Sequence, residues 1–167
     1  MGRREFEGRT QATIVTSPHE PFRLWLWHYV PPGRNYAGYH LTADRSGQAI
    51  LPRFLENLGT AKNDQQVTLT LAPLAQEIVA VPANPRGEPR SFNQLRIILR
   101  VASQRDLMTF SRSAERYTLE LSSARLDSVA EGILALSHEK DDYCIGDVEG
   151  QELWFWRCGL ESPRRRA

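Results

Sequence analysis

Two histidines and an aspartate in the first third of the chain are the residue types best suited to hold a metal ion. His28 and His40 stand on either side of a loop at residues 31–35, and Asp44 follows closely. A hairpin closed by this loop would make the two imidazoles diagonal neighbours on one sheet face, although a catalytic zinc site usually needs three protein ligands. A slip of one residue would move His40 to the opposite face. The alternative interpretation is a pair of half-buried histidines with satisfied hydrogen bonds.

A second group of reactive side chains lies near the C-terminal end. The run at residues 138–142 could hold a hard cation or transfer protons, but it matches no calcium-loop or zinc-protease spacing and suits the solvated end of a helix. Cys144 follows the carboxyl end of that predicted helix, where the helix dipole disfavours a thiolate, so we expect a buried structural cysteine. The chain contains no nucleophile elbow, phosphate-binding loop or dinucleotide motif. No catalytic residue and no cofactor is therefore predicted.

All four tryptophans fall in two Trp-x-Trp pairs, within residues 24–27 and 153–156. Side chains alternate between the faces of a strand, so each pair places two indole rings on one face and aliphatic or phenyl groups on the other. The rings either fill a core beneath a second layer, which we favour, or form a surface that binds a partner. In the second case the candidate binding surface consists of Arg23, Trp25, Trp27, Tyr29, Arg34, Trp154 and Trp156.

Composition limits the class of protein. The 167 residues are 41% hydrophobic, as expected of one domain with its own core, and the net charge of +1 argues against a dedicated nucleic-acid-binding protein. No apolar run approaches the roughly 20 residues that span a membrane, and the charged start lacks the apolar stretch of a secretory signal, so a cytoplasmic protein is predicted. Cys144 and Cys158 are expected to stay free thiols, because a terminal hairpin would hold them on the order of 13–17 Å apart.

Strand-like patterns alternate with two amphipathic helices along the chain. Strands are predicted at residues 12–16, 22–30, 36–42, 66–71, 78–81, 95–101, 117–121, 143–145 and 152–156. One helix ends near residue 58, with Asp44 or Ser46 as N-cap and Pro52 in its first turn. The other begins at Ser122 or Ser123 and carries an apolar stripe. The proline-rich stretch 82–89 is typical of a loop, and the charged interval 102–116 is ambiguous.

Tight spacing between the strands favours antiparallel pairing. We therefore predict an α+β fold in which a single antiparallel sheet of about 6–8 strands has two helices packed on one face. This domain would span residues 12–160, with a flexible N-terminus at 1–11 and a disordered basic tail at 161–167. The two halves share a loosely similar strand–helix–strand order, which duplication or chance could produce.

The expected function is that of a small, soluble, non-enzymatic bacterial protein that acts as a protein–protein interaction module, as accessory subunits and immunity-type proteins do. Residues 141–146 together with 153–156 resemble the ends of small bacterial proteins, a likeness that implies no activity. The partner would be another protein or a second copy, with no membrane, and nucleic acid is disfavoured. One alternative is a metal-binding protein or enzyme that uses His28, His40 and Asp44. Another is a weak nucleic-acid binder that uses the arginines of the tail.

Overall fold

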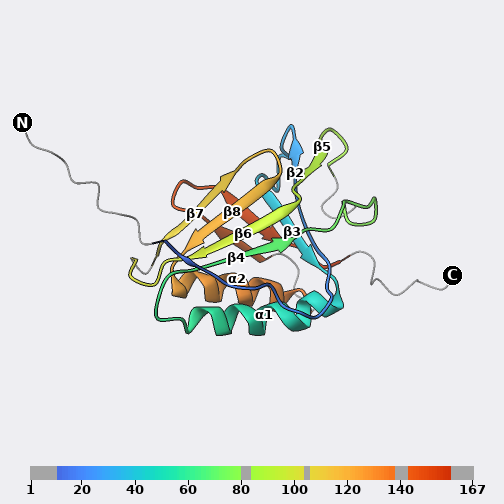
Figure 1. Cartoon of the computed structure of the whole chain (residues 1–167). Helices are drawn as coiled ribbons and strands as arrows, with labels where there is room; N and C mark the ends of the chain where they lie inside the picture. The colour runs from blue at the N-terminus through green and yellow to red at the C-terminus, as the bar shows by residue number, and fades with distance from the viewer. Residues whose placement is uncertain (1–10, 80–83, 104–105, 138–142, 159–167) are drawn as a thin grey trace, which may run out of the picture.

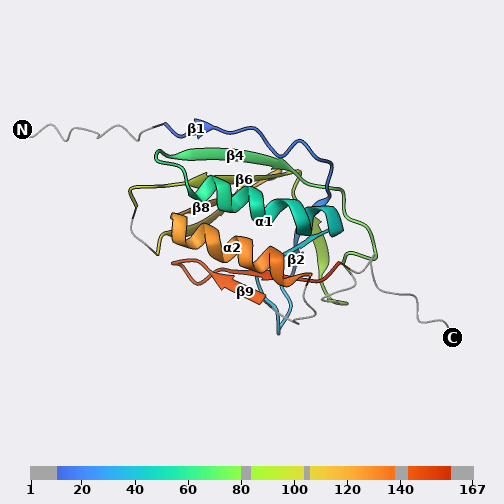
Figure 2. The same ribbon diagram turned by 90° about the horizontal axis from the view of Figure 1, so that it is seen from below.

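Two sheets stand above a pair of helices (Figure 1). This computed structural model describes residues 11–79, 84–103, 106–137 and 143–158. Helix α1 spans Arg45–Gly59 and helix α2 spans Ser123–Ala135. The view from below shows the two helices side by side across the strands (Figure 2). The main core lies where the inner faces of both sheets meet the buried faces of both helices.

Each sheet has five strands. The first sheet has the order β1-β4-β6-β8-β7, formed by β1 Thr13–Ile14, β4 Gln65–Thr70, β6 Gln94–Leu99, β8 Arg116–Leu121 and β7 Met108–Arg112. The second sheet has the order β5-β2-β3-β10-β9, formed by β5 Glu88–Ser91, β2 Leu24–Val30, β3 Tyr39–Ala43, β10 Glu152–Phe155 and β9 Tyr143–Gly146.

The strand pairing corrects the sequence prediction. The predicted single antiparallel sheet is wrong: there are two mixed sheets, in which β10 runs parallel to β3, β8 parallel to β6, and β1 parallel to β4. The cause is that each helix carries the chain from one sheet to the other, α1 between β3 and β4 and α2 between β8 and β9. Short spacing favours hairpins, but it does not show which strands from distant parts of the chain become neighbours. The α+β class and the two helices are confirmed.

The two halves of the chain repeat one topology. The elements β2–β3–α1–β4–β6 and β7–β8–α2–β9–β10 follow one another in the same order, and each half contributes two antiparallel pairs, β2–β3 with β4–β6 and β7–β8 with β9–β10. The parallel pairs join the halves, β3 to β10 and β8 to β6. Each helix begins after a side-chain cap, Asp44 for α1 and Ser122 for α2. Each repeated strand of one sheet therefore has a counterpart in the other sheet, contributed by the opposite half of the chain. The strands β1 and β5 have no counterpart and lie outside this repeat.

The halves differ in the loop between their last two strands. In the second half this loop is a tight turn, closed by a hydrogen bond from the Asp147 amide to the Gln151 carbonyl at 2.9 Å. In the first half the corresponding bond, from the Leu71 amide to the Asn93 carbonyl at 2.9 Å, closes a much longer loop. That longer loop contains β5, and its early part packs on the outer face of the second sheet. Only one of the two sheets is therefore covered on its outer face by such a loop.

Helix α1 is longer than the sequence predicts. The Asp44 carboxylate caps it by accepting a hydrogen bond from the Gly47 amide at 2.9 Å. Pro52 lies in the interior of the helix, and its predicted place in the first turn is wrong. The proline removes one backbone hydrogen bond, but the buried side chains of Leu51 and Leu55 on either side hold the helix against the core.

Two strands escaped the sequence analysis. The β7 strand lies in the charged interval 102–116 and is too short to show a clear period. The β5 strand contains Pro89, which suits an edge strand because proline cannot donate to a ladder. Conversely, Ile78 and Val79 form a turn where the strand 78–81 was predicted, and residues 80–81 lie outside the described part.

Three predictions fall largely or wholly outside the described residues: the flexible N-terminus at 1–11, of which only residue 11 is described, the basic tail at 161–167, and the polar run at 138–142. Among the residues that are described, no helix is long and apolar enough to cross a membrane.

Candidate functional site

The aromatic face of the second sheet is a second core and not an open surface. Trp27 is fully buried, and Trp25 and Trp156 are 2% and 7% exposed. The early part of the long β4–β6 loop covers these rings and contributes Ile78 to their cluster. Hydrogen bonds hold the cover in place: Trp25 Nε1 donates to the Pro73 carbonyl at 3.1 Å. Three of the four tryptophans therefore serve the interior of the fold.

The remaining members of the candidate binding surface lie around this core. The Tyr29 hydroxyl donates to the Val79 carbonyl at 2.8 Å, so Tyr29 also anchors the covering loop. Trp154 is half-buried, and its Nε1 donates to the Ala37 carbonyl at 3.0 Å. The Arg23 guanidinium lies 5.2 Å from the centre of the Trp25 ring, a cation–π contact. Arg34 is exposed.

His40 belongs to the aromatic core. Its side chain is 1% exposed and its Nδ1 accepts a hydrogen bond from Trp156 Nε1 at 3.0 Å. The rings of Trp27 and Tyr29 lie with their centroids 5.5 Å from the imidazole. Burial, and to a smaller extent the charge of the nearby His28, lower the pKa of His40 to about 4. His40 is therefore neutral at physiological pH and works as a hydrogen-bond acceptor inside the fold.

The structure does not bring His28, His40 and Asp44 together. In the β2–β3 pair His28 faces Tyr39, whereas His40 faces Trp27, so the two imidazoles lie on opposite faces of the second sheet. Asp44 is occupied as the N-cap of α1 and pairs with Arg23 at 3.4 Å. In the described part of the chain, no three potential metal-binding side chains gather into a site. The predicted ligand set therefore has no common centre.

His28 instead meets an arginine from the other half of the chain. Its Nε2 lies 3.0 Å from Arg112 Nη1, and because guanidinium only donates, the imidazole accepts in its neutral form. Burial lowers the pKa of His28, and the positive charges of Arg112 and Arg90 lower it further. Elsewhere, Cys144 faces Trp154 across the β9–β10 pair and is half-buried, whereas a buried cysteine was predicted. Burial and the Glu152 carboxylate raise the pKa of this thiol to about 11, which disfavours a nucleophilic thiolate.

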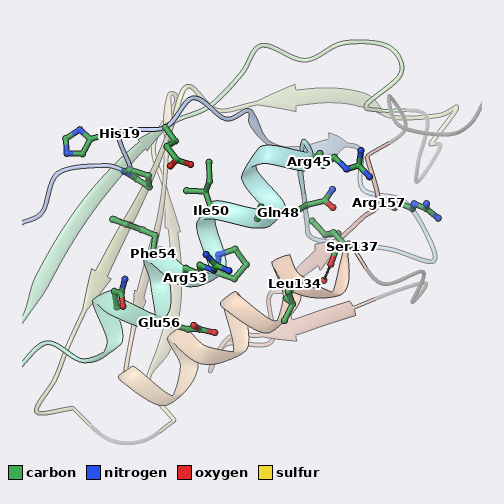
Figure 3. A pocket seen from close by; sticks show the side chains of 16 residues that line it. His19, Arg45, Gln48, Ile50, Arg53, Phe54, Glu56, Leu134, Ser137 and Arg157 are labelled. Carbon is green, nitrogen blue, oxygen red and sulfur yellow. Dashed lines mark hydrogen bonds between the residues drawn. The ribbon is translucent and has the colours of Figure 1, made fainter.

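A wide groove lies over the helix layer, and none of the candidate site residues described above lines it (Figure 3). It has a volume of about 1290 Å³ and runs between α1, the segment that leads into β2, and the carboxyl end of α2. Apolar side chains lie open in it: Ile50 and Phe54 of α1 are half-buried, and Leu134 of α2 is 43% exposed.

Charged side chains line the same groove. Arg45, Arg53, Arg157 and His19 contribute basic groups, and Glu20 and Glu56 contribute carboxylates. In the part of the chain that the structure describes, neither Arg53 nor Arg157 forms an ion pair. Long arginine side chains with no carboxylate partner are suited to bidentate contacts with a bound carboxylate.

The sequence contained a signal for this groove. The apolar residues of α1 cover a wider arc than one buried face requires: Leu51, Leu55 and Leu58 face the core, whereas Ile50 and Phe54 form a second stripe beside it. The helical spacing of these five residues does not by itself separate the two stripes. The groove itself could not be predicted, because it depends on where α2 and the segment before β2 come to lie.

Comparisons with known proteins add no relatives. No family model matches the chain, and neither curated proteins nor solved structures show a significant match.

Proposed function

We propose that this protein is a non-enzymatic protein–protein interaction module, and that its partner docks in the groove over the helix layer. The observation that carries the proposal is the groove itself, in which Phe54 and Leu134 leave apolar surface open beside the guanidinium of Arg53, which has no ion pair with any described residue. Exposed apolar surface with a polar rim is characteristic of protein interaction sites. In this proposal the aromatic sheet is the scaffold and the helices carry the docking surface.

The size of the groove favours a protein segment over a small molecule. Small-molecule sites are enclosed clefts of roughly 300–1,000 Å³. The groove exceeds that range at about 1290 Å³ and is open to solvent along the helices (Figure 3). Recognition of a segment laid into a groove between helices is a recurring mode of peptide binding.

The metal-binding or enzymatic alternative has little geometric support. His28 and His40 lie on opposite sheet faces, and Asp44 caps a helix. Weak nucleic-acid binding gains no support from Trp25, Trp27 and Trp156, which are buried and therefore offer no stacking surface to a base. Unlike the residues of these two alternatives, the open apolar surface of the groove has no structural role in the fold.

Site-specific photo-crosslinking in the native host tests the docking surface. A photoreactive amino acid replaces the exposed Asn57 in the groove, and a matched variant carries it at the exposed Ser111 on β7 of the first sheet. We expect a discrete protein adduct from position 57, absent from position 111 and lost on adding Leu134→Glu. An adduct with a second copy would identify the partner as this same chain. No adduct at position 57, or equal adducts at both positions, would refute the proposal.

A further inference from the structure

We infer that the occupant of the groove is an acidic segment of another protein that carries bulky apolar anchors. This inference rests on the proposed function and specifies the chemistry of the partner. It follows from the distribution of charge along the groove and from the apolar side chains on its floor.

Two arginines lie at one end of the groove. Arg45 is the first residue of α1, and Figure 3 shows it beside Arg157, which follows β10. The amino end of α1 is already capped by the Asp44 carboxylate, which accepts a hydrogen bond from the Gly47 amide, so the positive groups at this end are the two guanidinium groups. A carboxylate of the partner placed here would meet both guanidinium groups.

The middle of the groove combines charge with apolar surface. Arg53 lies between the two ends in Figure 3, with Ile50 and Phe54 on the same helix and Leu134 on α2. Large side chains of a partner can cover these three apolar residues while an acidic neighbour pairs with Arg53. Burying each such anchor would contribute roughly 1.5–3 kcal/mol before the cost of ordering the segment.

The carboxylate of Glu56 sets the direction of the bound segment. Figure 3 shows Glu56 well away from Arg45 and Arg157, so this carboxylate offsets positive charge in the part of the groove farther from those two arginines. The acidic residues of the partner should therefore gather at the end nearest to Arg45 and Arg157. Like charges at the other end would be repelled by Glu56.

The chain's own C-terminal segment does not complement this surface. Beyond the described residues the sequence continues to Arg164-Arg165-Arg166, whose charge has the same sign as the arginines of the groove. A partner of opposite sign is attracted both by the groove and by this basic sequence.

Fluorescence anisotropy with the full-length protein tests the inference. The probe is a labelled short peptide with a cluster of Glu residues at one end and Leu and Phe one helical turn apart at the other, and its twin has Lys in place of every Glu. We expect the acidic peptide to bind and the twin not to bind. Arg53→Glu and Arg157→Glu should each weaken binding by about tenfold or more, and added salt should weaken it as well.

The matched control is Arg34→Glu, which makes the same charge change at an exposed position outside the groove. It should leave the affinity within about twofold. Failure of the acidic peptide to bind, equal binding of the twin, or an equal loss with Arg34→Glu would overturn the inference. If the acidic peptide failed to bind but crosslinking from position 57 still captured a protein, docking in the groove would be supported and only the acidic character of the occupant would be refuted. If the peptide failed to bind and position 57 gave no adduct, both the proposed function and this inference would be refuted.

Discussion

The rings of Tyr39 and Tyr117 meet with their centroids 4.5 Å apart, and the two residues occupy corresponding positions in the two halves of the chain. Tyr39 begins the β3 strand that leads to the Asp44 cap, and Tyr117 stands at the same distance before the Ser122 cap. The strand residues opposite these tyrosines, His28 and Arg112, also correspond and also meet, at 3.0 Å. The repeated halves thus contact each other through equivalent positions that carry different residues.

The Tyr117 hydroxyl gives a prediction about stability. Tyr117 is fully buried, and its hydroxyl has no hydrogen-bond partner in the part of the chain described. Burial raises the pKa of this phenol far above its usual value. Because removing an unpaired buried hydroxyl loses no hydrogen bond, Tyr117→Phe should leave the free energy of unfolding unchanged or higher.

The matched control for Tyr117→Phe is Tyr29→Phe, which deletes a hydroxyl bonded to the Val79 carbonyl at 2.8 Å. Urea denaturation should show a loss of about 1 kcal/mol for Tyr29→Phe and none for Tyr117→Phe. A comparable loss for both variants would show that the Tyr117 hydroxyl has a partner after all.

The low pKa of buried His40 predicts that the folded protein loses stability in mild acid. Its folded-state pKa is about 4, below the ordinary 6.5, so the unfolded chain binds a proton that the folded chain does not. The contribution is complete above about pH 6.5 and is lost as the pH falls from there toward 4, by about 3 kcal/mol in total. His40→Gln keeps an acceptor for Trp156 Nε1 but does not titrate. Unfolding free energies measured from pH 7 to pH 4 should fall more steeply for the wild type than for His40→Gln, and parallel slopes would contradict this.

The contact between His28 and Arg112 predicts that the pKa of His28 depends on Arg112, which lies far away in the sequence. Burial is the largest cause of the lowered pKa of His28, and the charge of Arg112 is the next. Arg112→Gln should therefore raise the pKa of His28 toward its ordinary value, as followed by NMR titration of the imidazole resonances. Arg86→Gln removes an exposed positive charge elsewhere and should leave that pKa unchanged. If the pKa of His28 did not change in Arg112→Gln, the result would show that the two side chains are not in contact in solution.

Two glycines with positive φ predict unequal costs of adding a methyl group. Gly38 has φ +107°, and a Cβ there would collide with the carbonyl of Glu152 in the neighbouring strand β10. Gly150 has φ +83°, and a Cβ there would meet nothing within 4 Å. Gly150→Ala should cost about 1–2 kcal/mol from backbone strain alone, and Gly38→Ala should cost clearly more. Thermal or urea denaturation of both variants measures the difference, and equal losses would show that β10 moves aside at little cost.

Tryptophan fluorescence tests which indoles belong to the second core. Trp25, Trp27 and Trp156 are buried, whereas Trp154 is half-buried. Iodide should therefore quench only a minor part of the native emission, and Trp154→Phe should remove most of that quenchable part. Strong quenching that survives Trp154→Phe would mean that the covering loop opens in solution.

Most of the local structure could be predicted from the sequence, but the pairing of the strands could not. Asp44 and Ser122 were each one of two predicted N-caps. These caps, the apolar stripe of α2 and the terminal hairpin agree with the structure, because each depends on contacts between residues close in sequence. The metal hypothesis failed geometrically on a single register step, which turned His40 away from His28. That step depends on the loop between β2 and β3, whose conformation its composition does not specify.

The sequence by itself determined the α+β class, the two helices and the two tryptophan-bearing strands that are apolar on both faces. The reason is that the spacing of apolar residues indicates which side of an element must be buried. Only the tertiary structure decided what covers each side. It placed the β4–β6 loop over Trp25 and Trp27, set strands of one half beside strands of the other, and left Phe54 and Leu134 open on the helices. The physical reason is that burial is non-directional: a pattern of apolar residues fixes the need for a cover, and the topology of the whole chain selects the segment that supplies it.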